Sequence, residues 1–94
     1  MNKVPEAILT FLGDHVKTVN ESDGIHYYFY DYDTDDIKST IPDCSDTEFL
    51  KGLSQLMNLG YIYNNRRLIR MYPDGFTYYE DNIKKEKIDF SNYA

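Results

Sequence analysis

Three aspartates have the spacing of a calcium-binding loop. Asp31, Asp33 and Asp35 alternate within the stretch HYYFYDYDTDD, and alternate carboxylates of one loop can converge on a calcium ion. The rest of that pattern is missing, because Asp36 stands where the loop needs glycine and Pro42 where it needs a bidentate glutamate. We therefore interpret these carboxylates as a solvated segment that caps a short helix, and we predict neither a metal site nor a cofactor.

Histidine and cysteine offer little further chemistry. His15, His26 and Cys44 show no metal-ligand spacing. Cys44 lies in the acidic segment IPDCSD, which lacks the positive surroundings that lower a thiol pKa. Because the chain also shows no nucleophile paired with a base, no carboxylate pair with a substrate cleft and no glycine-rich phosphate loop, we predict that it is not an enzyme.

All the arginines of the chain fall within five residues. They are Arg66, Arg67 and Arg70, and Lys51 precedes them on a predicted helix. Such a cluster can form a positive patch that contacts the phosphates of double-stranded DNA. The alternative is a solvated hairpin tip, where basic side chains also keep a sheet edge from aggregating.

The stretch 26–36 also carries five tyrosine and phenylalanine rings among its four aspartates. The aspartates argue against stacking on nucleic-acid bases, which needs interleaved basic residues. Tyrosine is enriched at protein interfaces, so we predict a protein-interaction surface here. Its residues are Tyr28, Tyr30, Asp31, Tyr32, Asp33, Asp35 and Asp36. The alternative places Tyr27 and Phe29 in the core, with the other tyrosines merely covering the strand.

The length and the net charge of the chain limit the class of protein to which it can belong. The 94 residues predict one domain, 1–94, with a modest core and no deep cleft. The net charge of −6 is uneven: residues 1–50 carry three lysines and eleven acids, whereas residues 51–94 carry seven basic and five acidic residues. One cysteine and no leader or long apolar run predict a cytoplasmic protein without a membrane span. Abundant Asn, Lys, Ile and Tyr suggest an AT-rich bacterial or phage genome.

Four helical and three extended segments should position these residues. Apolar spacing predicts a first helix from Pro5 to Lys17, and β-branched and aromatic residues predict a strand over 25–32. A short helix over 35–40 should be capped by Asp33 or Thr34 and stopped by Pro42.

The segment SDTE holds the clearest local signal. Ser45 and Glu48 form the pattern of a capping box, so a helix should begin at Asp46. It should bury an apolar face and end near Gly60. The residues of that face are Phe49, Leu50, Leu53, Leu56 and Met57.

The C-terminal third should form a hairpin and a helix. Strands are expected over 61–63 and 68–71, with Asn64 and Asn65 taking the positive φ of the turn. Pro73 should open a last helix that buries Phe76, Tyr79 and Ile83. The pairs Glu80 with Lys84 and Asp81 with Lys85 should line its outside, and the tail 89–94 should be frayed.

This order of elements, an α+β arrangement, resembles that of the winged helix-turn-helix superfamily. The segment LMNLGYI is similar to the end of its recognition helix, and IRMYPDGFTYYED to its step from wing strand to C-terminal helix. The likeness covers about 34–86 and implies a three-helix core, a β-hairpin wing with its tip at 64–67, and a recognition helix over 46–59. Tyr72 departs from the pattern, because a Thr or Ser cap is expected there.

Two functions follow as hypotheses. The first is a small DNA-binding transcription regulator of bacterial or phage origin, for which a homodimer through the first or last helix is one option. Its nucleic-acid-binding residues would be Lys51, Ser54, Gln55, Asn58, Asn65, Arg66, Arg67 and Arg70. The second is an acidic, tyrosine-rich interaction module or phage-encoded inhibitor that does not bind DNA.

Overall fold

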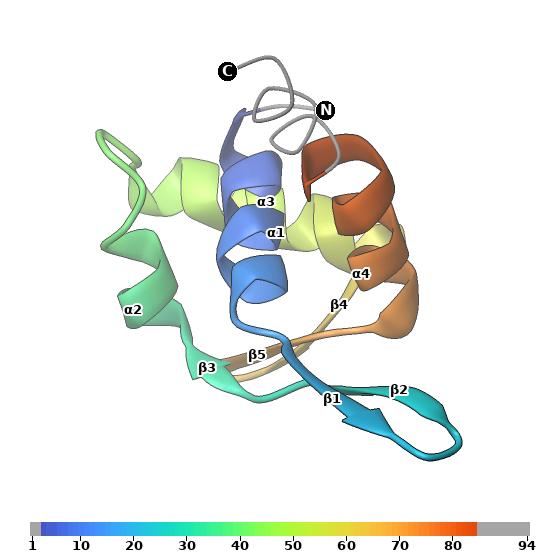
Figure 1. The fold of residues 1–94 in the computed structure, drawn as a ribbon. Helices are drawn as coiled ribbons and strands as arrows, with labels where there is room; N and C mark the ends of the chain where they lie inside the picture. The colour runs from blue at the N-terminus through green and yellow to red at the C-terminus, as the bar shows by residue number, and fades with distance from the viewer. Residues whose placement is uncertain (1–2, 85–94) are drawn as a thin grey trace.

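The computed structural model describes residues 3–84, which form an α+β domain with helices packed on one side of a small antiparallel sheet (Figure 1). The elements, in chain order, are α1 (Lys3–Asp14), β1 (Lys17–Glu21), β2 (Gly24–Tyr28), β3 (Tyr32–Asp33), α2 (Thr34–Lys38), α3 (Asp46–Asn58), β4 (Ile62–Asn65), β5 (Leu68–Met71), α4 (Pro73–Tyr78) and the π-helix η1 (Tyr79–Lys84).

The main sheet has the strand order β3-β5-β4, and all its pairs are antiparallel. Its inner face contributes Ile62, Ile69 and Met71 to the core, where each side chain is at most 2% exposed. Above them lie Ile8, Leu9 and Leu12 of α1 and the buried residues of α3. This core fixes the sheet, so the opposite face is left to solvent.

Helix α3 begins where the sequence predicts. The backbone N–H of Glu48 donates to Ser45 Oγ over 3.1 Å, and the Ser45 N–H donates to Glu48 Oε1 over 3.4 Å, so the capping box is formed. The prediction of the buried face is only partly right. Phe49, Leu53 and Leu56 are buried, whereas Leu50 is 61% and Met57 40% exposed. The reason is that α1 and the sheet cover a narrower stripe of α3 than the five apolar positions would fill.

The β4–β5 hairpin forms, but its turn differs from the prediction. Asn64 and Asn65 belong to the β4 ladder, and Arg66 takes the positive φ of 57°. The Asn64 side chain stabilises this turn, because its Nδ2 donates to the carbonyls of Arg66 and Leu68, each over 3.1 Å.

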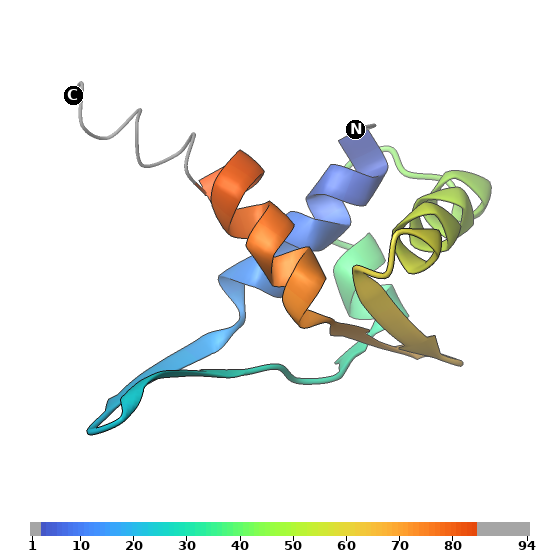
Figure 2. The same ribbon diagram turned by 90° about the vertical axis from the view of Figure 1, so that its right-hand side faces the viewer.

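The first helix ends at Asp14 rather than Lys17, and a second hairpin follows it. We call β1 and β2, residues 17–28, the arm. Its strands pair with Glu21 opposite Gly24, leaving a two-residue turn, and Gly24 has a φ of 131°. The arm extends away from the body of the protein (Figures 1 and 2). The single strand expected over 25–32 is therefore split between the arm and the main sheet.

Pro73 opens α4 as predicted, although the Tyr72 side chain makes no cap hydrogen bond. A Cβ at Gly75 would overlap the Tyr61 carbonyl oxygen, so only glycine fits this close approach. From Tyr79 the helix widens into η1, and Phe76, Tyr79 and Ile83 are buried as expected.

From Tyr79 the backbone hydrogen bonds follow the i→i+5 pattern, so the α-helical i,i+4 geometry on which the ion-pair prediction rests does not apply there. Within the described part of the chain, the expected ion pair of Glu80 with Lys84 is not formed. The predicted Asp81 pair with Lys85 and the predicted frayed tail, 89–94, lie outside the described residues.

Candidate functional site

The solvent side of the main sheet forms a continuous surface, which we call the outer face. In antiparallel strands, residues directly opposite each other point to the same side. Asp33 lies opposite Leu68, and Tyr63 opposite Arg70, on the side away from the buried Ile69. The outer face comprises Asp31, Asp33, Tyr63, Asn65, Leu68, Arg70 and Tyr72.

Arg70 and Asp31 form a two-pronged ion pair on this face. Arg70 Nε donates to Asp31 Oδ1 and Nη2 donates to Oδ2, each over 3.0 Å. The hydrogen bonds that the guanidinium donates to Asp31, together with the Asp31 charge, raise the pKa of Arg70 above its ordinary value. Such a parallel pair fixes the plane of the arginine as well as its charge.

Arg67 also lies beside carboxylates, through one of its nitrogens, at the end of the hairpin. Its Nη2 lies 2.7 Å from Asp35 Oδ2 and 3.5 Å from Asp33 Oδ2. Asp33 also caps α2, because its Oδ1 accepts a hydrogen bond of 2.8 Å from the Asp35 N–H. The backbone joins the two segments too, since the Thr34 N–H donates to the Arg67 carbonyl over 2.7 Å.

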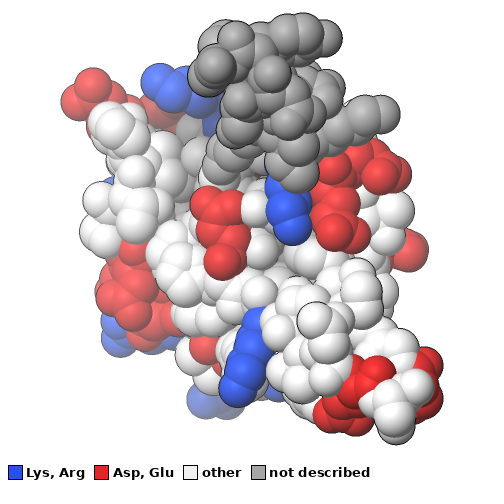
Figure 3. Space-filling view, in the orientation of Figure 1, with Lys and Arg blue, Asp and Glu red and all other residues white. Residues whose placement is uncertain are grey.

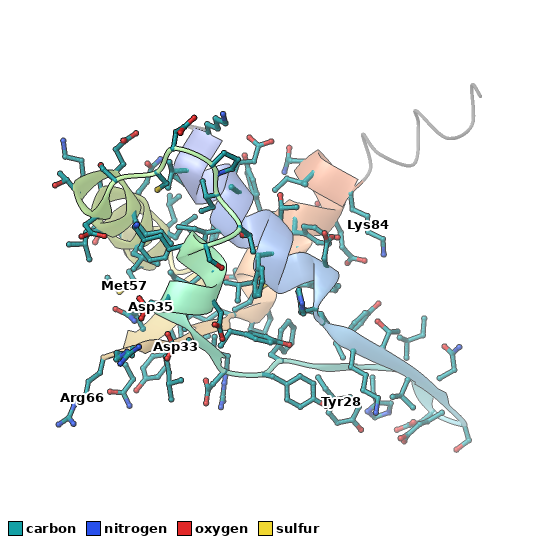
Figure 4. All side chains as sticks on the ribbon, turned by 90° about the vertical axis from the view of Figure 1, so that its left-hand side faces the viewer. Tyr28, Asp33, Asp35, Met57, Arg66 and Lys84 are labelled. Carbon is teal, nitrogen blue, oxygen red and sulfur yellow. The ribbon has the colours of Figure 1, made fainter. Side chains whose placement is uncertain are left out.

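The structure therefore brings together two sets of residues. Sequence analysis places the aspartates in a protein-interaction surface and the arginines in a DNA-binding surface, but in the fold they are neighbours. Each aspartate with calcium-loop spacing is engaged within the protein: Asp31 binds Arg70, Asp33 caps α2 and lies near Arg67, and Asp35 binds Arg67. Figure 4 shows Asp33 and Asp35 beside the hairpin, with Arg66 pointing away from the body. Arg66 has no ion pair among residues 3–84.

Apolar side chains surround the ion pairs of the outer face. Tyr63 is 46%, Leu68 43% and Tyr72 41% exposed. The Tyr63 and Tyr72 rings pack at 6.1 Å between centroids. Sequence reasoning missed these three residues as a site, although the alternation of 68, 70 and 72 away from the buried 69 and 71 was a usable signal.

The predicted tyrosine surface is divided by the fold. Tyr28 and Tyr30 are exposed, and Tyr28 extends from the arm in Figure 4. Tyr32 instead packs against Phe11 and His15, and its hydroxyl donates to the His15 carbonyl over 3.4 Å. Burial, then the neighbouring Tyr30, raises the pKa of Tyr32. The remaining predicted residue, Asp36, is exposed on α2.

The solvent side of α3 carries the other predicted DNA contacts. Lys51, Ser54, Gln55 and Asn58 line a shallow open depression together with Thr47, Leu50 and Leu59. The depression holds one basic side chain, and the first turn of the helix adds the exposed acids Asp46 and Glu48.

The histidines and the cysteine lie apart. The Nδ1–H of His15 donates to the Phe11 carbonyl over 2.7 Å, and Cys44 is half-buried against the core. His26 Nε2 lies 2.8 Å from Asp23 Oδ1 and 3.6 Å from Glu21 Oε2 on the exposed arm. Glu21, Asp23 and His26 are the only described residues whose metal-ligating atoms cluster, all within 4.8 Å of one another, and all three lie on the solvent-facing arm.

Comparisons of the chain with protein-family profiles, with curated proteins and with solved structures gave no match. Among residues 3–84, no helix has the length and apolar character needed to cross a membrane.

Proposed function

We propose that this chain is a winged-helix domain that acts as a protein-interaction module and binds its partner through the outer face. One observation carries the proposal. The aspartates of the acidic segment occupy Arg67 and Arg70, while Tyr63, Leu68 and Tyr72 beside them stay exposed. DNA would have to displace carboxylates from the two arginines, whereas a protein can bury the whole face.

The order of elements supports the winged-helix part of the proposal. Without the arm, the chain runs α1, β3, α2, α3, β4, β5 and α4, with β3 paired to β5 and the hairpin β4–β5 in the place of a wing. The arm is then an addition between α1 and β3. Because one fold hosts many functions, the function is argued from the outer face and not from this order.

Electrostatics favours a protein partner over a nucleic acid. Four aspartates (31, 33, 35 and 36) accompany the three arginines, so the charge of this region is −1. Non-specific DNA binding depends on cations that release counterions from phosphates, and here aspartates already pair with two of the three arginines, Arg67 and Arg70.

The composition of the outer face also fits a protein interface. Tyrosine and arginine are enriched among residues that dominate binding energy, and they act best when neighbouring contacts exclude water. An Arg70 side chain already held by Asp31 loses little conformational freedom on binding. We expect the partner to offer apolar pockets for Tyr63 and Tyr72.

DNA binding is the second candidate function. Its support is that Arg66 extends from the hairpin tip without an ion pair in the described structure, and that Lys51, Ser54 and Gln55 are reachable on α3. These side chains have the types that contact phosphates and base edges.

Fluorescence anisotropy with a labelled random duplex separates the two candidates. For the wild-type chain at physiological salt we expect a Kd weaker than about 10⁻⁴ M, the weak end of non-specific binding. The double variant Asp31→Asn, Asp35→Asn removes the carboxylate charges from Arg70 and Arg67, so it should bind more tightly, and increasingly so as salt is lowered. Salt-sensitive wild-type binding that disappears in Arg66→Ala, Arg67→Ala would instead favour the DNA candidate.

The partner can be sought with a photo-crosslinking amino acid placed at position 68, in a lysate of the source organism. The crosslinked protein is then purified and its affinity measured against variants. We expect Tyr63→Ser, Tyr72→Ser to weaken binding about tenfold or more, because two anchors are lost. The matched control is Leu59→Ser, since Leu59 is similarly exposed, at 48%, directly after α3. Equal loss in both variants would contradict an interface on the outer face.

A further inference from the structure

The arm presents an open strand edge. Its two strands pair with each other, and no other strand among residues 3–84 pairs with β1. Both strands are largely exposed, and the free end of the arm lies away from the helices (Figure 2). A two-stranded hairpin is only marginally stable in water, and an open edge is a template for pairing with another chain.

The register identifies the backbone groups on that edge. An antiparallel ladder alternates between hydrogen-bonded and non-bonded pairs, and the pair that flanks a two-residue turn is hydrogen-bonded. Because Glu21 pairs with Gly24 and Val19 with His26, the N–H and C=O of Val19 face β2. The N–H and C=O of Thr18 and Asn20 therefore face outward.

The side chains of β1 make this edge complementary to itself. In the strand KTVNE, Lys17 and Glu21 lie at equal distances on either side of Val19 and on the same face. If two β1 strands run antiparallel about Val19, each Lys17 lies opposite the Glu21 of the other copy. A parallel pair in the same register would instead place lysine against lysine, which is unfavourable.

We propose that β1 pairs with β1 of a second copy of this chain, antiparallel and centred on Val19, to form a symmetric dimer with a continuous four-stranded sheet. Thr18 of each copy exchanges backbone hydrogen bonds with Asn20 of the other, and two Lys17–Glu21 pairs flank the central valines. The interface is isologous, as most dimer interfaces are. The dimer interface uses none of the outer-face residues, so a test that rules out the dimer leaves the proposed function untouched, and the reverse also holds.

One face of the proposed four-stranded sheet also carries side chains of β2. Tyr28 lies opposite Lys17 and His26 opposite Val19, so these side chains share the face that carries the ion pairs. Glu21 lies 3.6 Å from His26 Nε2 and would sit between that imidazole and the incoming lysine. Figure 3 shows acidic side chains gathered at the free end of the arm, where the lysine of the second copy would arrive.

Sedimentation equilibrium of the full chain tests the dimer. Five residues on each strand make a small interface, so we expect dissociation in the range of about 10 μM to 1 mM. Lys17→Glu and Glu21→Lys should each raise the dissociation constant about tenfold or more, because each creates two like-charge pairs. The double variant Lys17→Glu, Glu21→Lys restores opposite charges across the dyad and should recover dimerisation.

Two controls keep the outcome decisive. Lys3→Glu makes the same charge change at an exposed site on α1 and should leave the dissociation constant unchanged. Cross-strand NMR contacts between Val19 and His26 verify that the arm is still folded in each variant. A wild-type chain that stays monomeric at 1 mM, or single variants that dimerise like wild type, would overturn the proposal. So would a double variant with an intact arm that fails to recover.

Discussion

Tyr79 joins the C-terminal helix to α1. Its side chain is 4% exposed, its ring lies against Gly13, and its hydroxyl donates to an oxygen of Asp14. Burial, then the hydrogen bond and charge of Asp14, raises the pKa of Tyr79 well above the ordinary value of 10.0. The folded state thus holds a phenolic proton that the unfolded chain releases near pH 10.

The raised pKa of Tyr79 predicts that the free energy of unfolding falls at alkaline pH. Above about pH 10 the unfolded chain binds fewer protons than the folded one, so the free energy of unfolding should fall as pH rises. We expect a slope of up to about 1.4 kcal/mol per pH unit from this one group. Urea unfolding between pH 8 and 11.5 measures it.

The matched variant is Tyr79→Phe, which keeps the ring and removes the proton. Its unfolding free energy should depend less steeply on pH above 10, although Tyr32, whose pKa is also raised, keeps part of the slope. An unchanged slope in Tyr79→Phe would show that the phenol of Tyr79 titrates normally in the folded protein.

At the scale of elements, α3 shows how a local signal fixes a boundary. Ser45 Oγ accepts from the Glu48 N–H, and the Glu48 carboxylate returns to the Ser45 N–H. Ser45→Ala should therefore lower the free energy of unfolding by about 1 kcal/mol, since the first turn loses a partner for a backbone N–H. Chemical denaturation measures the change.

Thr47→Ala is the control for that experiment, because Thr47 is exposed in the same turn and makes no cap. We expect it to stay within about 0.5 kcal/mol of wild type. Equal losses in the two variants would mean that side-chain propensity and not the cap decides the stability of this turn.

Elements with such local signals were predictable, and the arm was not. The capping box at Ser45 and Pro73 at the start of α4 gave the right helix starts. The strand KTVNE has one apolar residue, Val19, which also fits the helical spacing of α1, so the first helix was predicted too long. Only pairing with β2 shows this segment to be a strand.

At the scale of the whole molecule, the candidate site depends on sheet register. Arg70 and Asp31 lie far apart in sequence and meet because β3 and β5 pair with Tyr32 opposite Ile69. Periodicity could assign each residue to a strand, but it could not say which strand would lie beside which. The aspartates and arginines therefore looked like two sites until the fold placed them on one.

The arm should be separable from the body. Its main ring contact with the core is Tyr27 on Phe76, at 5.1 Å between centroids. Because Lys17 lies opposite Tyr28, the chain enters and leaves the arm at neighbouring points. Replacing residues 17–28 by two glycines should leave a folded body that is about 1 kcal/mol less stable, from the lost ring contact. Circular dichroism with urea unfolding measures both, and an unfolded product would show that the arm is part of the core.

The region around the outer face is close to electrical neutrality, and this balance has an evolutionary consequence. Four aspartates against three arginines leave this region one charge from neutrality. Exchanging two of the aspartates for asparagine would change its charge from −1 to +1, and losing one arginine would change it to −2. Neither change touches the buried residues of the sheet. A few substitutions could thus redirect descendants of this fold toward different partners while the scaffold is inherited unchanged.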